Sequence, residues 1–383
     1  MDRIQSINPA RIAWCCADHG ITPEALAAEV GMSADRMSAV MLDGEGLTFN
    51  QLRSVAEYFG RGVLFFMDPN QVEPKQAHTV QFRTLAQQKP ELSPKLKLLI
   101  ERAEKQRQVF LSLQSDLEDG TWAPFVAPVL PTGQIAAAAG ITRQWLGLSE
   151  ANDFESYRSA LESKGILVFR TNGFNGKWQI AKESPIVGFA LYDAHCPVIV
   201  VKKLASEAPQ AFTLMHELAH VLLHKTSWID DETDLRSTQS AERDVNFFAG
   251  LVLVPDHFLD IISDQNRPEE VALLEEWLKP QRKKWGASTE VILRRLMDAG
   301  RLPHSVYEDY RAWASARKYN NDEQGGSRAY RHREPKHIFG DRYVRTVLDS
   351  LSAQHITLSE ASGYLDGLKI ADLHELERYC ART

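Results

Sequence analysis

The sequence predicts an α+β protein that is mostly helical. Apolar residues recur at helical spacing along most of the chain, whereas three short apolar runs, 165–170, 186–192 and 197–202, have the length and composition of strands. Residues 212–224, FTLMHELAHVLLH, contain no Gly or Pro and carry apolar residues on several faces, which is typical of a helix buried in a core. We therefore expect a short three-stranded sheet with helices packed around it.

Length, charge and Cys spacing limit the number of domains, the kinds of binding partner and the cellular location that are expected. The chain has 383 residues and a net charge of −7, which suits about two or three domains and does not suit a general binder of polyanions. The Cys residues have no metal-binding spacing, and two of them are adjacent, so a reduced, cytoplasmic location is expected. The N-terminus has no apolar signal core, and the apolar runs are too short for a membrane span.

We divide the chain into four parts. Residues 1–70 are a compact helical unit, and residues 71–125 are a linker that contains a long helix. Residues 126–300 hold the strands and the buried helix, and residues 301–383 are a basic, helical C-terminal region. The boundary before residue 126 rests on the segment DGTWAPFVAPVLPTG, which is rich in Pro and Gly.

Residues 1–70 contain four predicted helices. Helix-capping residues precede three of them: Thr22 before Pro23, Ser33 before Ala34, and Thr48 before the fourth helix. A short helix, a Gly turn and a second short helix within a larger bundle describe a helix-turn-helix.

The segment ITPEALAAEVGMSADRMSAVMLDGEGLTFNQLRSVAEYFG resembles the Xre-type (lambda-repressor-like) helix-turn-helix. The resemblance implies that residues 34–41 are the recognition helix and that Ser33, Arg36 and Ser38 contact a DNA operator. However, residues 1–70 hold 5 Lys or Arg against 9 Asp or Glu, and phosphate contacts need cations. A helical domain that docks a protein or forms a homodimer remains the alternative.

The buried helix carries the motif His-Glu-Leu-Ala-His, in which His216 and His220 lie one turn apart on one face. Both imidazoles can therefore bind one metal ion, and Zn²⁺ is the ion expected. Glu217, beside the first ligand, can act as the catalytic base on water at that metal. The alternative is a core helix that happens to carry two His residues.

A catalytic zinc usually has three protein ligands and one open position. His224 cannot be the third ligand, because it lies about 12 Å along the helix axis from His216. The ligand must come from another element. Residues 225–240 form a predicted polar loop whose acids are expected to be mostly solvated, although Asp231 or Asp234 remains an alternative ligand.

The segments GILVFR, IVGFALYD, PVIVVKK, AFTLMHELAHVLLH and AERDVNFFAGLVLVP together resemble the minimal zincin core of the ImmA/IrrE metallopeptidases. The last segment matches the family's E-x-x-x-N-x-F-A run, which implies Glu242 as the third ligand. It also implies that Asn246 positions a ligand or orders the Glu242 helix. No donor to the oxyanion is assigned, and His257 is the nearest candidate in the sequence.

Residues 328–345, RAYRHREPKHIFGDRYVR, combine six Lys or Arg with Tyr330, Phe339 and Tyr343. Such a segment can bind nucleic acid or an acidic partner. The alternative is a solvated charged face.

Two functions follow. The first is a zinc endopeptidase coupled to a helix-turn-helix, which the resemblance links to cleavage or control of a repressor or partner protein in stress, mobile-element or phage responses. The second is a DNA-binding antitoxin or transcriptional regulator, paired with a toxin, whose zinc site is structural or weakly active. The presence of Glu217 favours the enzyme, because a structural site needs ligands but no base.

Overall fold

The computed structural model describes residues 3–72, 85, 88–89, 92–117, 122–172, 176–237, 240–317 and 328–381. Contacts divide the chain into two units, Met1–Lys105 and Gln106–Thr383. The division falls within helix α7 (Pro94–Asp116), inside the predicted linker. Most of the rest of that linker, residues 73–84, and part of the predicted boundary segment, residues 118–121, lie outside the described residues.

The first unit begins with four helices and a 3₁₀ turn. They are α1 (Pro9–His19), α2 (Pro23–Glu29), α3 (Ala34–Asp43), α4 (Phe49–Tyr58) and η1 (Val63–Phe66). The Thr48 side chain and Gln51 form a reciprocal cap at the start of α4. Helices α2 and α3 pack against each other, and α3 extends two residues beyond the predicted recognition helix before it ends at Gly44, which has a φ of 68°.

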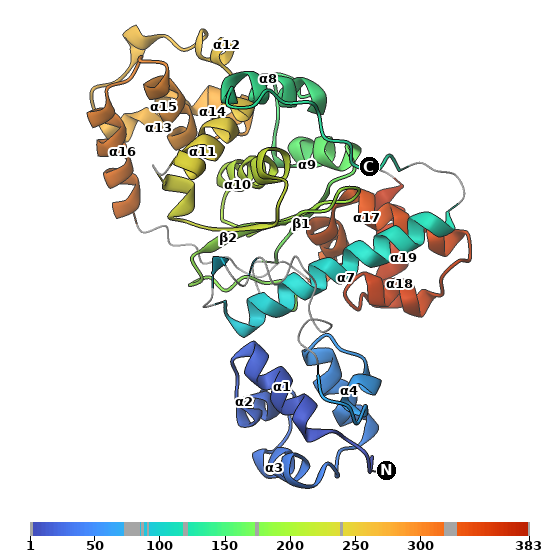
Figure 1. Cartoon of the computed structure of the whole chain (residues 1–383). Helices are drawn as coiled ribbons and strands as arrows, with labels where there is room; N and C mark the ends of the chain where they lie inside the picture. The colour runs from blue at the N-terminus through green and yellow to red at the C-terminus, as the bar shows by residue number, and fades with distance from the viewer. Residues whose placement is uncertain are drawn as a thin grey trace. The chain divides into compact units, whose positions relative to one another are not determined.

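The second unit is mainly helical (Figure 1). Its α-helices are α8 (Ile135–Leu146), α9 (Phe154–Ser163), α10 (Glu207–Ala219), α11 (Ser240–Leu253), α12 (Asp256–Leu259), α13 (Leu274–Trp277), α14 (Lys279–Trp285), α15 (Thr289–Asp298), α16 (His304–Ala316), α17 (Glu334–Ser352), α18 (Leu358–Tyr364) and α19 (Ile370–Cys380). Short 3₁₀ turns are η3 (Asp234–Arg236), η4 (Asp264–Asn266), η5 (Val271–Leu273) and η6 (Arg328–Arg333). In the described part of the chain, no helix is both long and apolar enough to cross a membrane.

The sheet has four strands rather than the three predicted, and with the helices it confirms an α+β fold. The strands are β1 (Leu167–Arg170), β2 (Ile186–Leu191), β3 (Val198–Val201) and β4 (Trp228–Asp231), in the order β1-β3-β2-β4. β1 is parallel to β3, and the other two pairs are antiparallel. The prediction of a continuous polar loop over residues 225–240 was wrong, because β4 forms there by pairing with β2.

Helix α10 packs on β2 and β3, and α11 packs on α10 (Figure 1). Leu214 and Leu218 of α10 and Val245 and Phe248 of α11 have no exposed surface, and all four belong to one hydrophobic core. The sheet and this core therefore hold α10 along its length.

Helix α17, which contains most of the basic segment 328–345, packs against β1. This packing limits what the segment can bind. Phe339 and Tyr343 are fully buried, and both contact the ring of Phe169 on β1. These two rings are therefore not available to stack on bases. Lys336 and Arg345 both pair with Asp341, which reduces the free positive charge.

Arg158 of α9 joins α17 to the sheet. Its guanidinium donates hydrogen bonds to the carbonyl of Val168 in β1 and to the carbonyls of Lys336, His337 and Ile338. It also lies 3.4 Å from the buried carboxyl of Glu162. Burial raises the pKa of Glu162 to about 7, although Arg158 opposes that shift.

We expect Arg158→Met to lower the free energy of unfolding by about 3–5 kcal/mol, because it leaves buried carbonyls and a buried carboxyl without their cation. Denaturant unfolding of the full chain measures the change. Arg378→Met removes an exposed ion pair with Glu375 and should cost less than about 1 kcal/mol. Equal effects of the two substitutions would contradict the role given to Arg158.

Candidate metal centre

The predicted buried helix forms, but its winding changes within the motif. Helix α10 ends at Ala219, and His220–His224 continue it as one π-helical turn, η2, which stops at Lys225 with a φ of 53°. Such turns are frequent at functional sites. His224 thereby brings its Nδ1 to 2.9 Å from Nδ1 of His220, and it stays outside the group of candidate metal ligands.

Four buried side chains from three parts of the fold converge on one point. They are His216 and His220 from α10 and η2, Asp230 from β4, and Glu242 from α11, and one donor atom of each lies within 4.8 Å of all the others. The Nε2 atoms of the two His residues are 3.2 Å apart. Glu242 Oε2 lies 3.4 Å from Nε2 of His216 and 3.8 Å from Nε2 of His220.

The Nδ1 atoms of both His residues have other partners. Nδ1 of His216 lies 3.0 Å from Oδ1 of Asn246, whose amide nitrogen donates to the backbone carbonyl of Asp234. Nδ1 of His220 faces His224. With Nδ1 of each imidazole donating its proton outward, both Nε2 lone pairs point to the same place, as metal ligation requires.

Buried carboxyl groups surround the two imidazoles, and their negative charge shifts the pKa values at the centre. Burial opposes protonation of His216, but the Asp230 and Glu242 carboxylates outweigh it and raise its pKa to about 9. Burial also raises the pKa of Glu217 well above its usual value, and the charge of Asp230 adds to this shift. Both shifts follow from carboxyl groups buried around two imidazoles, a charge distribution that a bound cation would balance.

The spacing of the donors fits zinc. Four atoms arranged tetrahedrally about 2.1 Å from one ion are roughly 3.4 Å from each other. The His216, His220 and Glu242 atoms are separated by 3.2–3.8 Å, and Oδ2 of Asp230 lies 3.4 Å and 3.2 Å from the two Nε2 atoms. Two imidazoles with carboxylates are also a donor set that zinc accepts. The centre can therefore hold a metal ion.

The structure brings together the residues singled out in the sequence as ligands, His216, His220 and Glu242, with Glu217 next to them in the chain and Asn246 beside His216. The alternatives lie elsewhere. Asp231 accepts hydrogen bonds from Thr233 and Asp234, and Asp234 accepts one from Asp231. His257 is exposed and contacts Phe258, and no contact joins it to the centre among the described residues.

Asp230 is the ligand candidate that the sequence did not identify. It belongs to the predicted loop over residues 225–240, whose acids are expected to be mostly solvated, but it has no exposed surface. Its position follows from the pairing of β4 with β2, in which Asp230 lies opposite Gly188. Residues opposite each other in antiparallel strands share one face, and the face at Gly188 is covered by α10.

The residues proposed for DNA contact lie on and beside α3. Ser33 and Ser38 are exposed, whereas Arg36 is half-buried with its Nη1 3.5 Å from Oε1 of Gln51. Their role in binding DNA remains a prediction.

We expect Gly188→Ala to lower the free energy of unfolding by about 1–3 kcal/mol through overpacking beneath Glu217. An added Cβ would lie 2.7 Å from Oε1 of Glu217, 2.8 Å from Cγ2 of Thr213 and 3.1 Å from the carbonyl of Val200. Gly140→Ala in α8 is the control, because a Cβ there meets no described atom within 4 Å. If denaturant unfolding shows equal stability for both variants, the tight packing of β2 against Glu217 is disproved.

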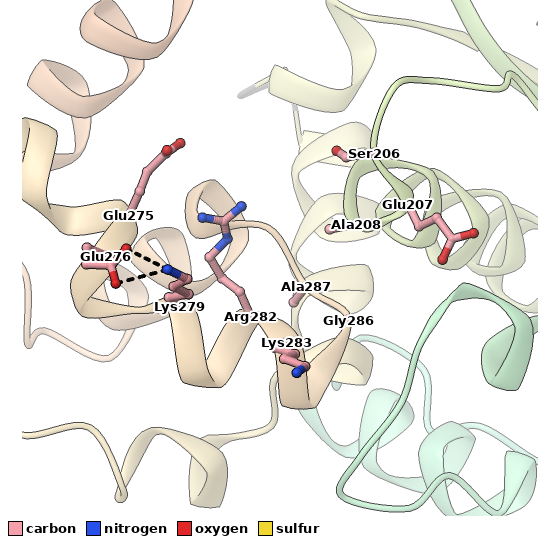
Figure 2. A pocket seen from close by; sticks show the side chains of 10 residues that line it. All are labelled: Ser206, Glu207, Ala208, Glu275, Glu276, Lys279, Arg282, Lys283, Gly286 and Ala287. Carbon is pink, nitrogen blue, oxygen red and sulfur yellow. Dashed lines mark hydrogen bonds and ion pairs between the residues drawn. The ribbon is translucent and has the colours of Figure 1, made fainter. Parts of the chain in front are cut away.

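A separate pocket of about 430 Å³ lies at the opposite end of α10, between its first residues and helices α13 and α14 (Figure 2). It is lined by Ser206, Glu207, Ala208, Glu275, Glu276, Lys279, Arg282, Lys283, Gly286 and Ala287. Glu276 and Lys279 pair with each other inside it. None of the four candidate metal ligands lines this pocket, so it is distinct from the metal centre.

The fold and the site define a small α+β domain with a buried candidate metal centre and an adjacent glutamate, an arrangement typical of metal-dependent hydrolases. Residues 161–297 match the model of a protein family described as the IrrE N-terminal-like domain, Peptidase_M78. The matched residues include Glu217 and all four donors, and the match supports similarity to the ImmA/IrrE family and indicates a metallopeptidase-like function. A comparison with curated proteins found no match.

Proposed function

We propose that the chain is a zinc-dependent endopeptidase. The observation that carries the proposal is Glu217, a fully buried carboxyl group next to a cluster of four potential metal ligands. Among the described residues neither of its carboxyl oxygens has a hydrogen bond of normal geometry, and its close neighbour is another carboxyl group, that of Asp230. A purely structural site would gain nothing from such a group, because burying an unpartnered carboxyl group costs free energy.

Each residue of the centre would have a separate role in peptide hydrolysis. His216, His220 and Glu242 hold the ion, and Asn246 and His224 fix the orientation of the two imidazoles. Zinc, when bound, polarises the carbonyl of a peptide bond and lowers the pKa of water. Glu217 takes the proton from water at its carboxylate and passes it to the leaving amine. Burial and the neighbouring charge of Asp230 raise the pKa of Glu217, which favours retention of the proton between these two transfers.

The substrate proposed is a repressor or another partner protein, in a response to stress, a mobile element or phage. The N-terminal helices would bring the peptidase to a DNA operator or to that partner. Support for this part comes from the resemblance of residues 21–60 to the Xre-type helix-turn-helix and from the exposure of Ser33 and Ser38.

The test uses the purified full chain. We expect one Zn²⁺ per chain by elemental analysis, and new N-termini in proteins of the native host that disappear after chelation and return when Zn²⁺ is added. A chain that binds no metal, or new termini that persist under chelation, would contradict the proposal.

The second candidate is a DNA-binding antitoxin or transcriptional regulator of a toxin–antitoxin-like pair. Its metal site would be structural or weakly active. It is favoured by Asp230, because four protein donors are typical of structural zinc sites. In that case the chain should retard its own promoter fragment in a shift assay, and substitution of Ser33, Arg36 and Ser38 by Ala should abolish a sequence-selective shift. A shift that is equal for unrelated DNA would rule out operator recognition.

A further inference from the structure

The segment of β4 and η3, residues 228–236, covers the metal centre. The Trp228 ring stacks on the imidazole of His220 with a centroid distance of 4.6 Å and an interplanar angle of 10°. Two residues further on, on the same face of the strand, Asp230 contributes its carboxylate to the donor cluster. The backbone carbonyl of Asp234 in η3 accepts the hydrogen bond from Asn246. Each of these contacts ties the segment to a metal ligand or to its supporting side chain.

Asp230 is not needed to orient the imidazoles. Those hydrogen bonds are made at Nδ1, to Asn246 and to His224, whereas Asp230 faces the Nε2 atoms. A carboxylate beside two nitrogen lone pairs is repelled unless a cation lies between them. Neither oxygen of Asp230 has an aligned hydrogen-bond donor among the described residues. Where that cation is a metal ion held by both Nε2 atoms, Asp230 faces it as a further ligand rather than as a supporting acceptor.

The number of donors decides what kind of centre this is. Catalytic zinc sites have three protein ligands and an open position for water, whereas structural sites have four. His216, His220 and Glu242 already provide three, and Asp230 Oδ2 lies at tetrahedral spacing from both Nε2 atoms and within 4.8 Å of the Glu242 donor. Resting on the peptidase function proposed above, we propose that Asp230 is a fourth protein ligand that occupies the open position and keeps the site closed and latent.

Burial of the centre agrees with this closed state. His216, Glu217, His220 and Asp230 have no exposed surface, and Glu242 is 8% exposed, so a peptide cannot reach Glu217 while the centre is in this closed state. Access requires Asp230 to leave the centre. β4 is suited to such a displacement because it is an edge strand of only four residues and pairs in the sheet with β2 alone.

The test replaces zinc with Co²⁺ in the full chain, because the visible spectrum of Co²⁺ reports its coordination. Azide is the probe, since it replaces metal-bound water far more readily than it displaces a protein ligand. The variants are Asp230→Asn, which weakens a ligand at constant size, and Glu232→Gln, which removes one charge from an exposed residue of the same segment.

We expect a four-coordinate spectrum in the wild type that azide does not change, and azide binding at least about tenfold tighter in Asp230→Asn. Zn²⁺ affinity should fall by about 10–100-fold or more in that variant, because even the loss of a supporting contact has this effect. Glu232→Gln should behave like the wild type in both measurements. If Asp230→Asn does not fold, the wild-type spectrum alone decides, because a change on adding azide overturns the proposal.

Peptide cleavage separates this proposal from the function on which it rests. If both hold, Asp230→Asn cleaves at least about tenfold faster than the wild type. If azide binds the variant selectively but neither protein cleaves, the site is closed and the endopeptidase proposal fails. If azide binds the wild type as tightly as it binds the variant, Asp230 is not a ligand, whatever the peptidase activity.

Discussion

Replacing Glu217 by Gln is expected to lower kcat/KM for peptide cleavage by about 10²–10⁴-fold, the usual contribution of a positioned general acid–base. Gln has nearly the same size but cannot accept and return a proton, so zinc content and thermal stability should stay close to those of the parent protein. Glu217→Gln is introduced into whichever parent protein cleaves faster, the wild type or Asp230→Asn. A closed site in the wild type then cannot mask the loss of kcat/KM.

Glu207→Gln provides the matched control for Glu217→Gln. Glu207 lies at the start of the same helix, and its side chain is 55% exposed and paired with Arg170. Cleavage should change by less than about twofold, because exposed ion pairs contribute little free energy. If Glu217→Gln keeps the parent rate, Glu217 is not the proton carrier and the peptidase mechanism is wrong.

Replacing His216 by Ala is expected to abolish most of the zinc-dependent stabilisation of the chain. A metal that binds the folded state alone adds about 4 kcal/mol when its free concentration is a thousand times Kd. The His216 imidazole is one of two nitrogen donors in the cluster, and the variant leaves Asp230 and Glu242 without it. Thermal unfolding with and without added Zn²⁺ should show a large shift for the wild type and little or none for His216→Ala.

His224→Ala should give an intermediate result. His224 contacts Nδ1 of His220 but is not among the four donors, so its removal should weaken zinc binding by about 10–100-fold rather than abolish it. If added Zn²⁺ raised the unfolding temperature of the wild type and of His216→Ala by the same amount, the zinc site would lie elsewhere in the protein.

The motif around His216 was predictable because its geometry is local. Two His residues four positions apart in a helix face the same side, and a helix that lacks Gly and Pro forms under most tertiary conditions. Glu242 and Asn246, which also lie one helical turn apart, were identified through the family resemblance. What periodicity could not supply was the distance between the two helices, and the family resemblance linked them instead.

Sequence alone therefore determined a mostly helical α+β chain and two imidazole donors with a neighbouring glutamate on one helix. Only the tertiary structure decided that β4 forms, that Phe339 and Tyr343 belong to the core, and that Asp230 faces the metal centre. A strand of four residues with two acids has no local pattern that separates it from a polar loop. Its pairing with β2, opposite Gly188, buries Asp230 and determines whether the centre is open or closed.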